Sequence, residues 1–112
     1  MVLIIGGAWQ GKLSWAVDNY DLAASDLCDL AEGFVPDRRC YYHLEVLTRR
    51  NEEWPAFPTD AIIISREVGC GVVPMEAEAR AWRERHGAAL QTLATNADHV
   101  VRIFCGLSEV LK

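Results

Sequence analysis

A short segment near the start of the chain has the residue types and spacing of a phosphate-binding loop. The segment Gly6-Gly7-Ala8-Trp9-Gln10-Gly11-Lys12 satisfies the pattern G-x-x-x-x-G-K. In such a loop the glycines let backbone N–H groups point at phosphate oxygens, and the lysine reaches the β- and γ-phosphates. We therefore predict that this segment binds a nucleotide and that Lys12 is catalytic. The alternative is a glycine-rich turn that binds nothing.

The residue after the lysine departs from this pattern. Leu13 stands where the pattern has a Ser or Thr hydroxyl for Mg²⁺. Ser14 follows, but on a helix it points about 100° away from position 13. We keep Leu13 in the predicted nucleotide-binding segment and predict that Mg²⁺ binding is altered there.

Two charged residues further along the chain are the other candidates for the site. Glu67 directly follows a predicted buried strand, where a carboxylate could hold Mg²⁺ through water or orient an acceptor hydroxyl. The alternative for Glu67 is a loop acid or a partner for Arg66. Arg83 lies on the longest predicted helix and is a candidate contact to phosphate. Its alternative is a surface ion pair with an acid one turn away.

Alternating strands and helices must position these residues. Apolar, β-branched runs predict buried strands, and apolar residues at helical spacing predict helices between them. Such alternation produces a parallel sheet with helices on both faces. We therefore predict a P-loop NTPase-like α/β fold in three layers, α/β/α, with a small, mostly parallel sheet. Strands are expected at 2–5, 27–30, 61–65 and 99–104, and helices at 11–19, 36–50 and 75–97.

Length and composition restrict the class of protein. The 112 residues predict a single nucleotide-binding domain over 1–112. With 11 Lys and Arg against 16 Asp and Glu, the net charge is −5, which disfavours broad contact with a nucleic-acid backbone. The four cysteines form no C-x₂-C pair, so a zinc ribbon or finger is not expected. The apolar run at the start is too short for a signal peptide or membrane span, and we expect a cytoplasmic protein.

Several blocks of the sequence together have the pattern of one family. After the opening glycine-rich segment come S-R-E-V-G-C-G-V-V-P at 65–74, A-W-R-E-x-x-G-x-x-x-Q at 81–91, A-D-x-V at 97–100 and G-L-x-x-x-L-K at 106–112. In order and spacing these blocks resemble the bifunctional adenosylcobinamide kinase / adenosylcobinamide-phosphate guanylyltransferases. The first two are similar to that family's phosphate loop and its S-N-E-V-G-x-G-I-V-P stretch. The resemblance covers about half the chain, residues 1–20 and 65–112.

This resemblance implies an enzyme of cobalamin assembly. Such enzymes use ATP or GTP to phosphorylate a hydroxyl of adenosylcobinamide and then transfer GMP through a guanylylated histidine. They are cytoplasmic and can form homo-oligomers. The expected ligands are therefore a nucleotide with Mg²⁺ and a corrinoid.

The middle of the chain departs from the family. The segment 49–54 resembles a remnant of the family's H-R-x-R-R-P-x-x-W stretch, and its histidine position then falls on Val46. His43 lies one helical turn earlier, and we see no carboxylate at a spacing that would orient it. The resemblance therefore implies a kinase without guanylyltransferase activity. The alternative is a degenerate, non-catalytic nucleotide- or corrinoid-binding partner or regulatory subunit, which Leu13 favours. His86 and His99 are interpreted as structural.

Overall fold

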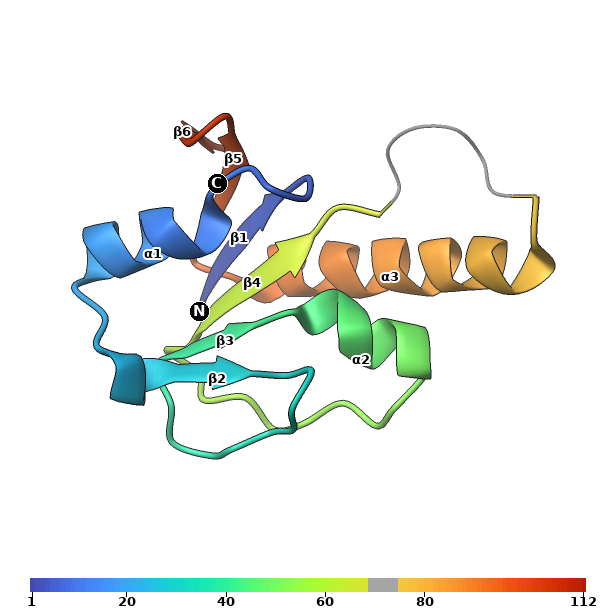
Figure 1. Ribbon diagram of the computed structural model, residues 1–112, viewed down its shortest axis with the longest axis horizontal. Helices are drawn as coiled ribbons and strands as arrows, with labels where there is room; N and C mark the ends of the chain where they lie inside the picture. Colours follow the sequence, from blue (N-terminus) through green and yellow to red (C-terminus); the bar gives the residue numbers. More distant parts are fainter. Residues whose placement is uncertain (69–74) are drawn as a thin grey trace.

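A six-stranded sheet forms the centre of the protein in the computed structural model, which describes residues 1–68 and 75–112. The strand order is β2-β3-β4-β1-β5-β6 (Figure 1). All pairings from β2 to β5 are parallel, and only β6 runs antiparallel to its neighbour. The strands are β1 (Val2–Gly6), β2 (Leu27–Asp29), β3 (Cys40–Tyr42), β4 (Ile62–Arg66), β5 (His99–Phe104) and β6 (Leu107–Val110).

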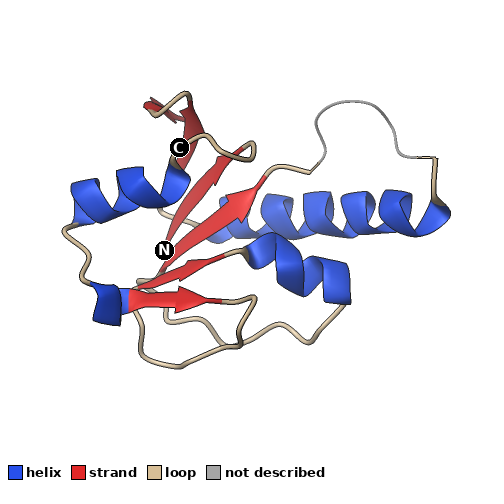
Figure 2. Ribbon diagram, viewed as in Figure 1, coloured by secondary structure: helices blue, strands red, loops and turns tan. Residues whose placement is uncertain are grey.

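Helices cover both faces of this sheet, as Figures 1 and 2 show. Helix α1 (Lys12–Tyr20) packs on one face, where Ala16 joins Ile4 and Ile64 in one buried cluster. Helices α2 (Leu44–Arg50) and α3 (Ala77–Asn96) pack on the other face, in a second cluster built around Leu3 and Ile63. A short 3₁₀ turn, η1 (Ala24–Asp26), precedes β2. The predicted three-layer α/β/α fold is therefore confirmed.

The apolar run at the start of the chain forms the central parallel strand. β1 pairs with β4 on one side and with β5 on the other. Leu3 and Ile4 are both completely buried, and they point into the two different clusters. A strand that is buried on both faces needs a continuous apolar sequence, which explains the run of β-branched residues.

The prediction of one helix over 36–50 is wrong in its first half. Cys40–Tyr42 is a strand, Asp37 lies in a turn with φ 62°, and the helix begins only at Leu44. Cys40 packs in the cluster on the α1 face, whereas Leu44 and Leu47 pack on the opposite face. The three residues therefore have the spacing of one helix face in the sequence, but they lie on two different faces of the sheet.

The last strand, β6, was not predicted. It follows β5 through a two-residue turn in which Cys105 (φ 52°) and Gly106 (φ 74°) both have positive φ. Such a turn matches the twist of an antiparallel hairpin. The other expected elements agree with the structure to within two residues at each end, including the loop between α2 and β4. The glycine-rich turn expected at 69–74 lies outside the described residues.

None of the helices in the described part of the chain has the length and apolar character needed to span a bilayer.

Candidate functional site

The glycine-rich segment connects the central strand to α1, as the phosphate-loop prediction requires. Gly6 is the last residue of β1, and Lys12 is the first residue of α1. Gly11, directly before the helix, has φ 87°, a left-handed conformation that glycine adopts without strain. The start of α1 has no side-chain cap and no acidic residue in its first turn. Its N–H groups are therefore available to an anion, and the helix dipole favours negative charge there.

The turn of the β5–β6 hairpin is hydrogen-bonded to this loop. The backbone N–H of Gly106 donates to the carbonyl of Gln10 at 2.9 Å, and the N–H of Cys105 donates to Gln10 Oε1 at 2.6 Å. Gly6 lies so close to β5 that a Cβ atom there would be 2.5 Å from the carbonyl oxygen of Ile103. The conformation of the loop is thus set by contacts with a segment about 95 residues away in sequence.

Lys12 curls back over the loop. Its Nζ donates a hydrogen bond to the carbonyl of Gly7 at 2.7 Å. Burial lowers the pKa of Lys12 below its usual value; the nearby Glu45 opposes this shift, Arg66 adds to it, and Glu67 opposes it. These contributions place two carboxylates and a guanidinium within electrostatic range of the ammonium group.

A cavity of about 520 Å³ opens beside the loop. It is lined by residues 8–14 of the loop and α1, by Tyr42, His43 and Glu45 where β3 leads into α2, and by residues 64–66 at the end of β4. These segments meet at the carboxyl ends of the parallel strands, where open α/β sheets bind their ligands. Its volume is that of a pocket for a small-molecule ligand. The structure therefore brings Lys12, Leu13 and most of the predicted loop residues together around one cavity.

Trp9, whose role the sequence left open, lies at the edge of this cavity. Its side chain is 98% exposed, and its φ is 62°. Such an exposed ring suits contact with a bound base or a corrin face. That role and shielding of the loop both stay predictions.

Glu67 and Arg83 are not among the residues that line the cavity in the described part of the chain. The N–H of Glu67 donates to the carbonyl of Gly6 at 2.9 Å, which places this residue directly beside the end of β1. Its carboxylate lies 3.5 Å from the guanidinium of Arg102 on β5. The sequence suggested Arg66 as an ion-pair partner of Glu67, whereas the structure shows an ion pair with Arg102. Arg83 lies on α3, half-buried.

The described residues offer limited donors for a metal ion. Across residues 1–68 and 75–112, no group of three or more His, Cys, Asp or Glu side chains is close enough to hold one. Ser14 lines the cavity, and Glu67 supplies a carboxylate near Lys12. Magnesium usually keeps several waters and binds one or two carboxylates together with substrate phosphates. This donor set fits Mg²⁺ carried on a nucleotide better than a metal held by the protein alone.

An aspartate that was not predicted contacts His43. Asp29, at the end of β2, accepts a hydrogen bond from Nδ1 of His43 at 2.7 Å. The two residues are brought together because β2 and β3 are parallel neighbours, with Asp29 in register with Tyr42. The expectation that no carboxylate orients His43 is therefore wrong, because Asp29 does so from 14 residues upstream. Recognising Cys40–Tyr42 as a strand would have been the signal needed to find it.

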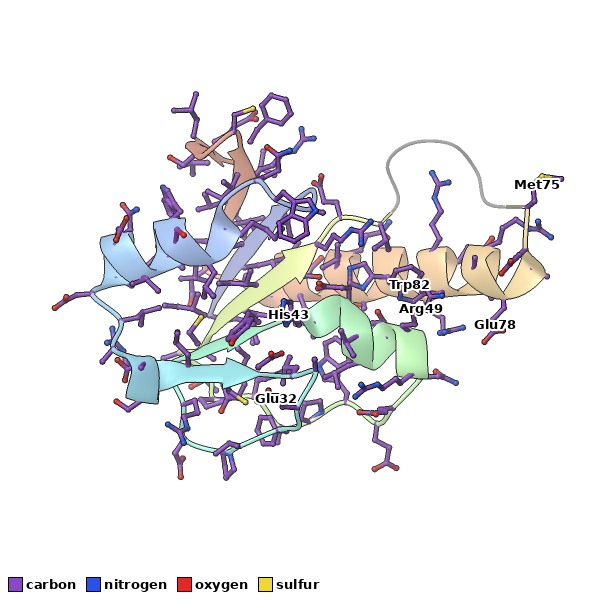
Figure 3. The ribbon with its side chains drawn as sticks, viewed as in Figure 1. Glu32, His43, Arg49, Met75, Glu78 and Trp82 are labelled. Carbon is purple, nitrogen blue, oxygen red and sulfur yellow. The ribbon has the colours of Figure 1, made fainter. Side chains whose placement is uncertain are left out.

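His86 connects three elements next to the cavity, namely α3, α2 and β4. It is completely buried on α3, where Nδ1 lies 2.8 Å from Thr48 Oγ1 and Nε2 lies 2.7 Å from the carbonyl of Arg66. Trp82, one turn earlier, donates to Thr48 Oγ1 at 3.1 Å and receives Arg49 over its ring at 4.6 Å (Figure 3). The structural interpretation of His86 fits these contacts. His99 is exposed at the start of β5.

The fold and this site define a P-loop-like α/β protein with three layers. A family model for cobinamide kinase / cobinamide phosphate guanyltransferase (CobU) matches residues 42–111. This match spans more than half of the chain, and the protein belongs to that family, with a role in cobinamide metabolism within cobalamin biosynthesis. A search of curated proteins found no match. The matched part begins at Tyr42 and includes Glu67 and Arg83, but not the phosphate loop.

Proposed function

We propose that this protein binds ATP or GTP in the phosphate loop and transfers the γ-phosphoryl group to a hydroxyl of cobinamide. The observation that carries the proposal is the position of Lys12 at the uncapped start of α1, on the wall of the cavity. Family membership supports the cobinamide acceptor.

The residues of the chain act in this proposal by positioning and by charge. The loop N–H groups and Lys12 hold the β- and γ-phosphates and stabilise the charge that develops on the transferred group. The hydrogen bond from Lys12 to the carbonyl of Gly7 is exchanged for one to phosphate. Mg²⁺, when present, neutralises phosphate charge, and the carboxylate of Glu67 and the hydroxyl of Ser14 are the groups that would hold its waters. Cytoplasmic location, formation of a homo-oligomer and loss of guanylyltransferase activity remain predictions.

A second candidate function is that of a non-catalytic subunit that binds a nucleotide or corrinoid. One observation favours it: Leu13 occupies the position of the hydroxyl that would contact Mg²⁺ directly. Such a subunit would bind without turnover, and its nucleotide binding would survive chelation of Mg²⁺.

Calorimetric titration with Mg·ATP and Mg·GTP, with and without EDTA, tests both candidates. Lys12→Ala should abolish micromolar binding. Lys112→Ala is a matched control, because this second lysine donates to the carbonyls of Ala94 and Thr95 at the end of α3 and does not line the cavity. A cobinamide phosphorylation assay with the same proteins follows. Nucleotide binding without turnover would favour the subunit, and no binding of either nucleotide would reject the kinase.

A further inference from the structure

We infer that His43 is a further catalytic residue of this site, a general base that is oriented by Asp29 and accepts the proton of the acceptor hydroxyl. The inference deepens the proposed function and rests on it. Neither the phosphate-loop pattern nor the position of the family match assigns this role to the pair.

His43 lines the same cavity as Lys12, but it comes from a different part of the fold. Figure 3 shows it between the end of β3 and the start of α2. Its side chain is 49% exposed, so a ligand in the cavity can reach the ring. A base for phosphoryl transfer must lie where the acceptor enters, beside the phosphates and not among them. The junction of β3 and α2 meets this requirement, because the phosphate loop supplies a separate wall of the cavity.

Both members of the pair are held in place by other contacts. Asp29 Oδ1 also accepts the backbone N–H of Ala31 at 2.9 Å, which fixes the carboxylate. His43 has φ 64° at the start of α2, and the ring of Tyr42 packs edge-on against the imidazole at 4.8 Å between centroids. The parallel pairing of β2 and β3 continues past the strands through the N–H of Leu30, which donates to the carbonyl of Tyr42 at 3.0 Å. Little reorganisation is therefore needed before proton transfer.

The hydrogen bond to Asp29 determines which ring nitrogen is basic. An ionised carboxylate only accepts hydrogen bonds, so Nδ1 of His43 must carry a proton. In the neutral imidazole Nε2 then has the free lone pair. Within residues 1–68 and 75–112, no hydrogen-bond partner of Nε2 is found. This arrangement, an imidazole with one nitrogen tied to a carboxylate on a residue that lines the cavity, is that of a general base.

Phosphoryl transfer with His43 as the base needs no reactant besides the nucleotide and the acceptor hydroxyl. The hydroxyl proton of the acceptor passes to Nε2 of His43, and the hydroxyl oxygen forms a bond to the γ-phosphorus. The bond between the γ-phosphorus and the bridging oxygen breaks, and the nucleoside diphosphate leaves with that electron pair. The imidazolium, stabilised by Asp29, then returns its proton to water.

His43→Asn tests this role with little risk to the fold. Asparagine tolerates the left-handed backbone at this position, and its amide can still donate to Asp29. We expect kcat for cobinamide phosphorylation to fall about 100-fold or more, the usual contribution of a general base, while the calorimetric affinity for nucleotide stays within about two-fold. Asp29→Asn should cause a smaller loss. His99→Asn, at an exposed position away from the cavity, is the matched control.

The pH profile separates a base from a structural histidine. Asp29 and Tyr42 contact the ring, and Lys12, Glu45 and Arg66 line the cavity beside it. Protonation of Nε2 removes the lone pair that would accept the hydroxyl proton. We expect kcat of the wild type to fall as the pH is lowered, and the residual activity of His43→Asn to lack this fall.

A measurement independent of turnover examines the pair directly. In ¹⁵N NMR spectra above pH 8, His43 should be the Nδ1–H tautomer in the wild type and lose that preference in Asp29→Asn. An Nε2–H tautomer in the wild type would overturn the inference. Turnover that is unaffected by His43→Asn would overturn it while leaving the proposed function intact, and a phosphoryl or nucleotidyl adduct trapped on His43 would show a nucleophile in place of a base. Absence of wild-type turnover would reject the proposed kinase and this role together.

Discussion

Nε2 of His86 lies 2.7 Å from the carbonyl oxygen of Arg66, so a histidine on α3 is anchored to the last residue of β4. Because a carbonyl only accepts, Nε2 must carry the proton. Nδ1 lies 2.8 Å from Oγ1 of Thr48 on α2. Ser65 Oγ is also 3.0 Å from Nε2. The contact joins the two helices on one face of the sheet to the strand end beside the candidate site.

Removal of this imidazole should destabilise the protein. His86→Phe keeps an aromatic ring but removes the shortest hydrogen bond to the carbonyl of Arg66 and one of the contacts of the Thr48 hydroxyl. We expect a loss of about 2–4 kcal/mol in the free energy of unfolding, measured by urea denaturation. His99→Ala, at an exposed position, should change it by about 0.5 kcal/mol or less. Equal effects of the two substitutions would contradict the anchoring role.

His86 should also make stability depend on pH. Burial lowers the pKa of His86 from its ordinary value of 6.5, although its hydrogen bond to the carbonyl of Arg66 and the nearby Glu45 oppose the shift. The folded state thus favours the neutral ring, and the unfolded chain takes up a proton at a higher pH. This contribution to stability is complete above about pH 6.5 and decreases as the pH falls below it. Unfolding of the wild type and His86→Phe across pH 4–8 should show a steeper acid loss in the wild type; parallel curves would argue against it.

Gly6 and Gly7 should differ sharply in their tolerance of a methyl group. At Gly6 a Cβ would meet the carbonyl oxygen of Ile103 at 2.5 Å, so Gly6→Ala must displace β5 or the loop. We expect a cost of about 1–3 kcal/mol in the free energy of unfolding. At Gly7 the nearest atom to a Cβ is the flexible Cγ of Gln10 at 3.6 Å, an ordinary contact. Gly7→Ala should therefore cost less than Gly6→Ala, and the reverse order would mean that the loop packs differently against the hairpin.

Glu67→Gln should raise the Mg²⁺ concentration that is needed for half-maximal turnover. The substitution keeps the shape of the side chain but removes the carboxylate that lies near Lys12 and 3.5 Å from Arg102. A several-fold increase is expected if turnover is measured at saturating nucleotide. Glu109→Gln on the exposed strand β6 is the control. An unchanged Mg²⁺ requirement in Glu67→Gln would contradict a role of this carboxylate in holding the metal.

The unit formed by β1, the glycine-rich loop and α1 could be predicted because its signals are adjacent in sequence. A continuous apolar run, a glycine pattern and a short helix follow one another within 20 residues. Strands β4 and β5 and helix α3 were predictable for the same reason, since the pattern of each lies in one continuous segment of the sequence. The parallel three-layer arrangement then follows from the alternation of strands and helices.

The side of the cavity formed by the end of β3 and the start of α2 could not be predicted, because it depends on tertiary contacts. Cys40 and Leu44 have the spacing of a helix, but they face opposite sides of the sheet, and only the pairing of β3 between β2 and β4 shows this. The contact of Asp29 with His43 arises from the register of those same strands. Likewise, the close approach of Gly6 to Ile103 needs β5 beside β1. The sequence alone thus determined which local segment has the pattern of a phosphate loop. The choice of neighbouring strands decided which side chains meet that segment, because this choice is made by burial across the whole sheet and not by any local pattern.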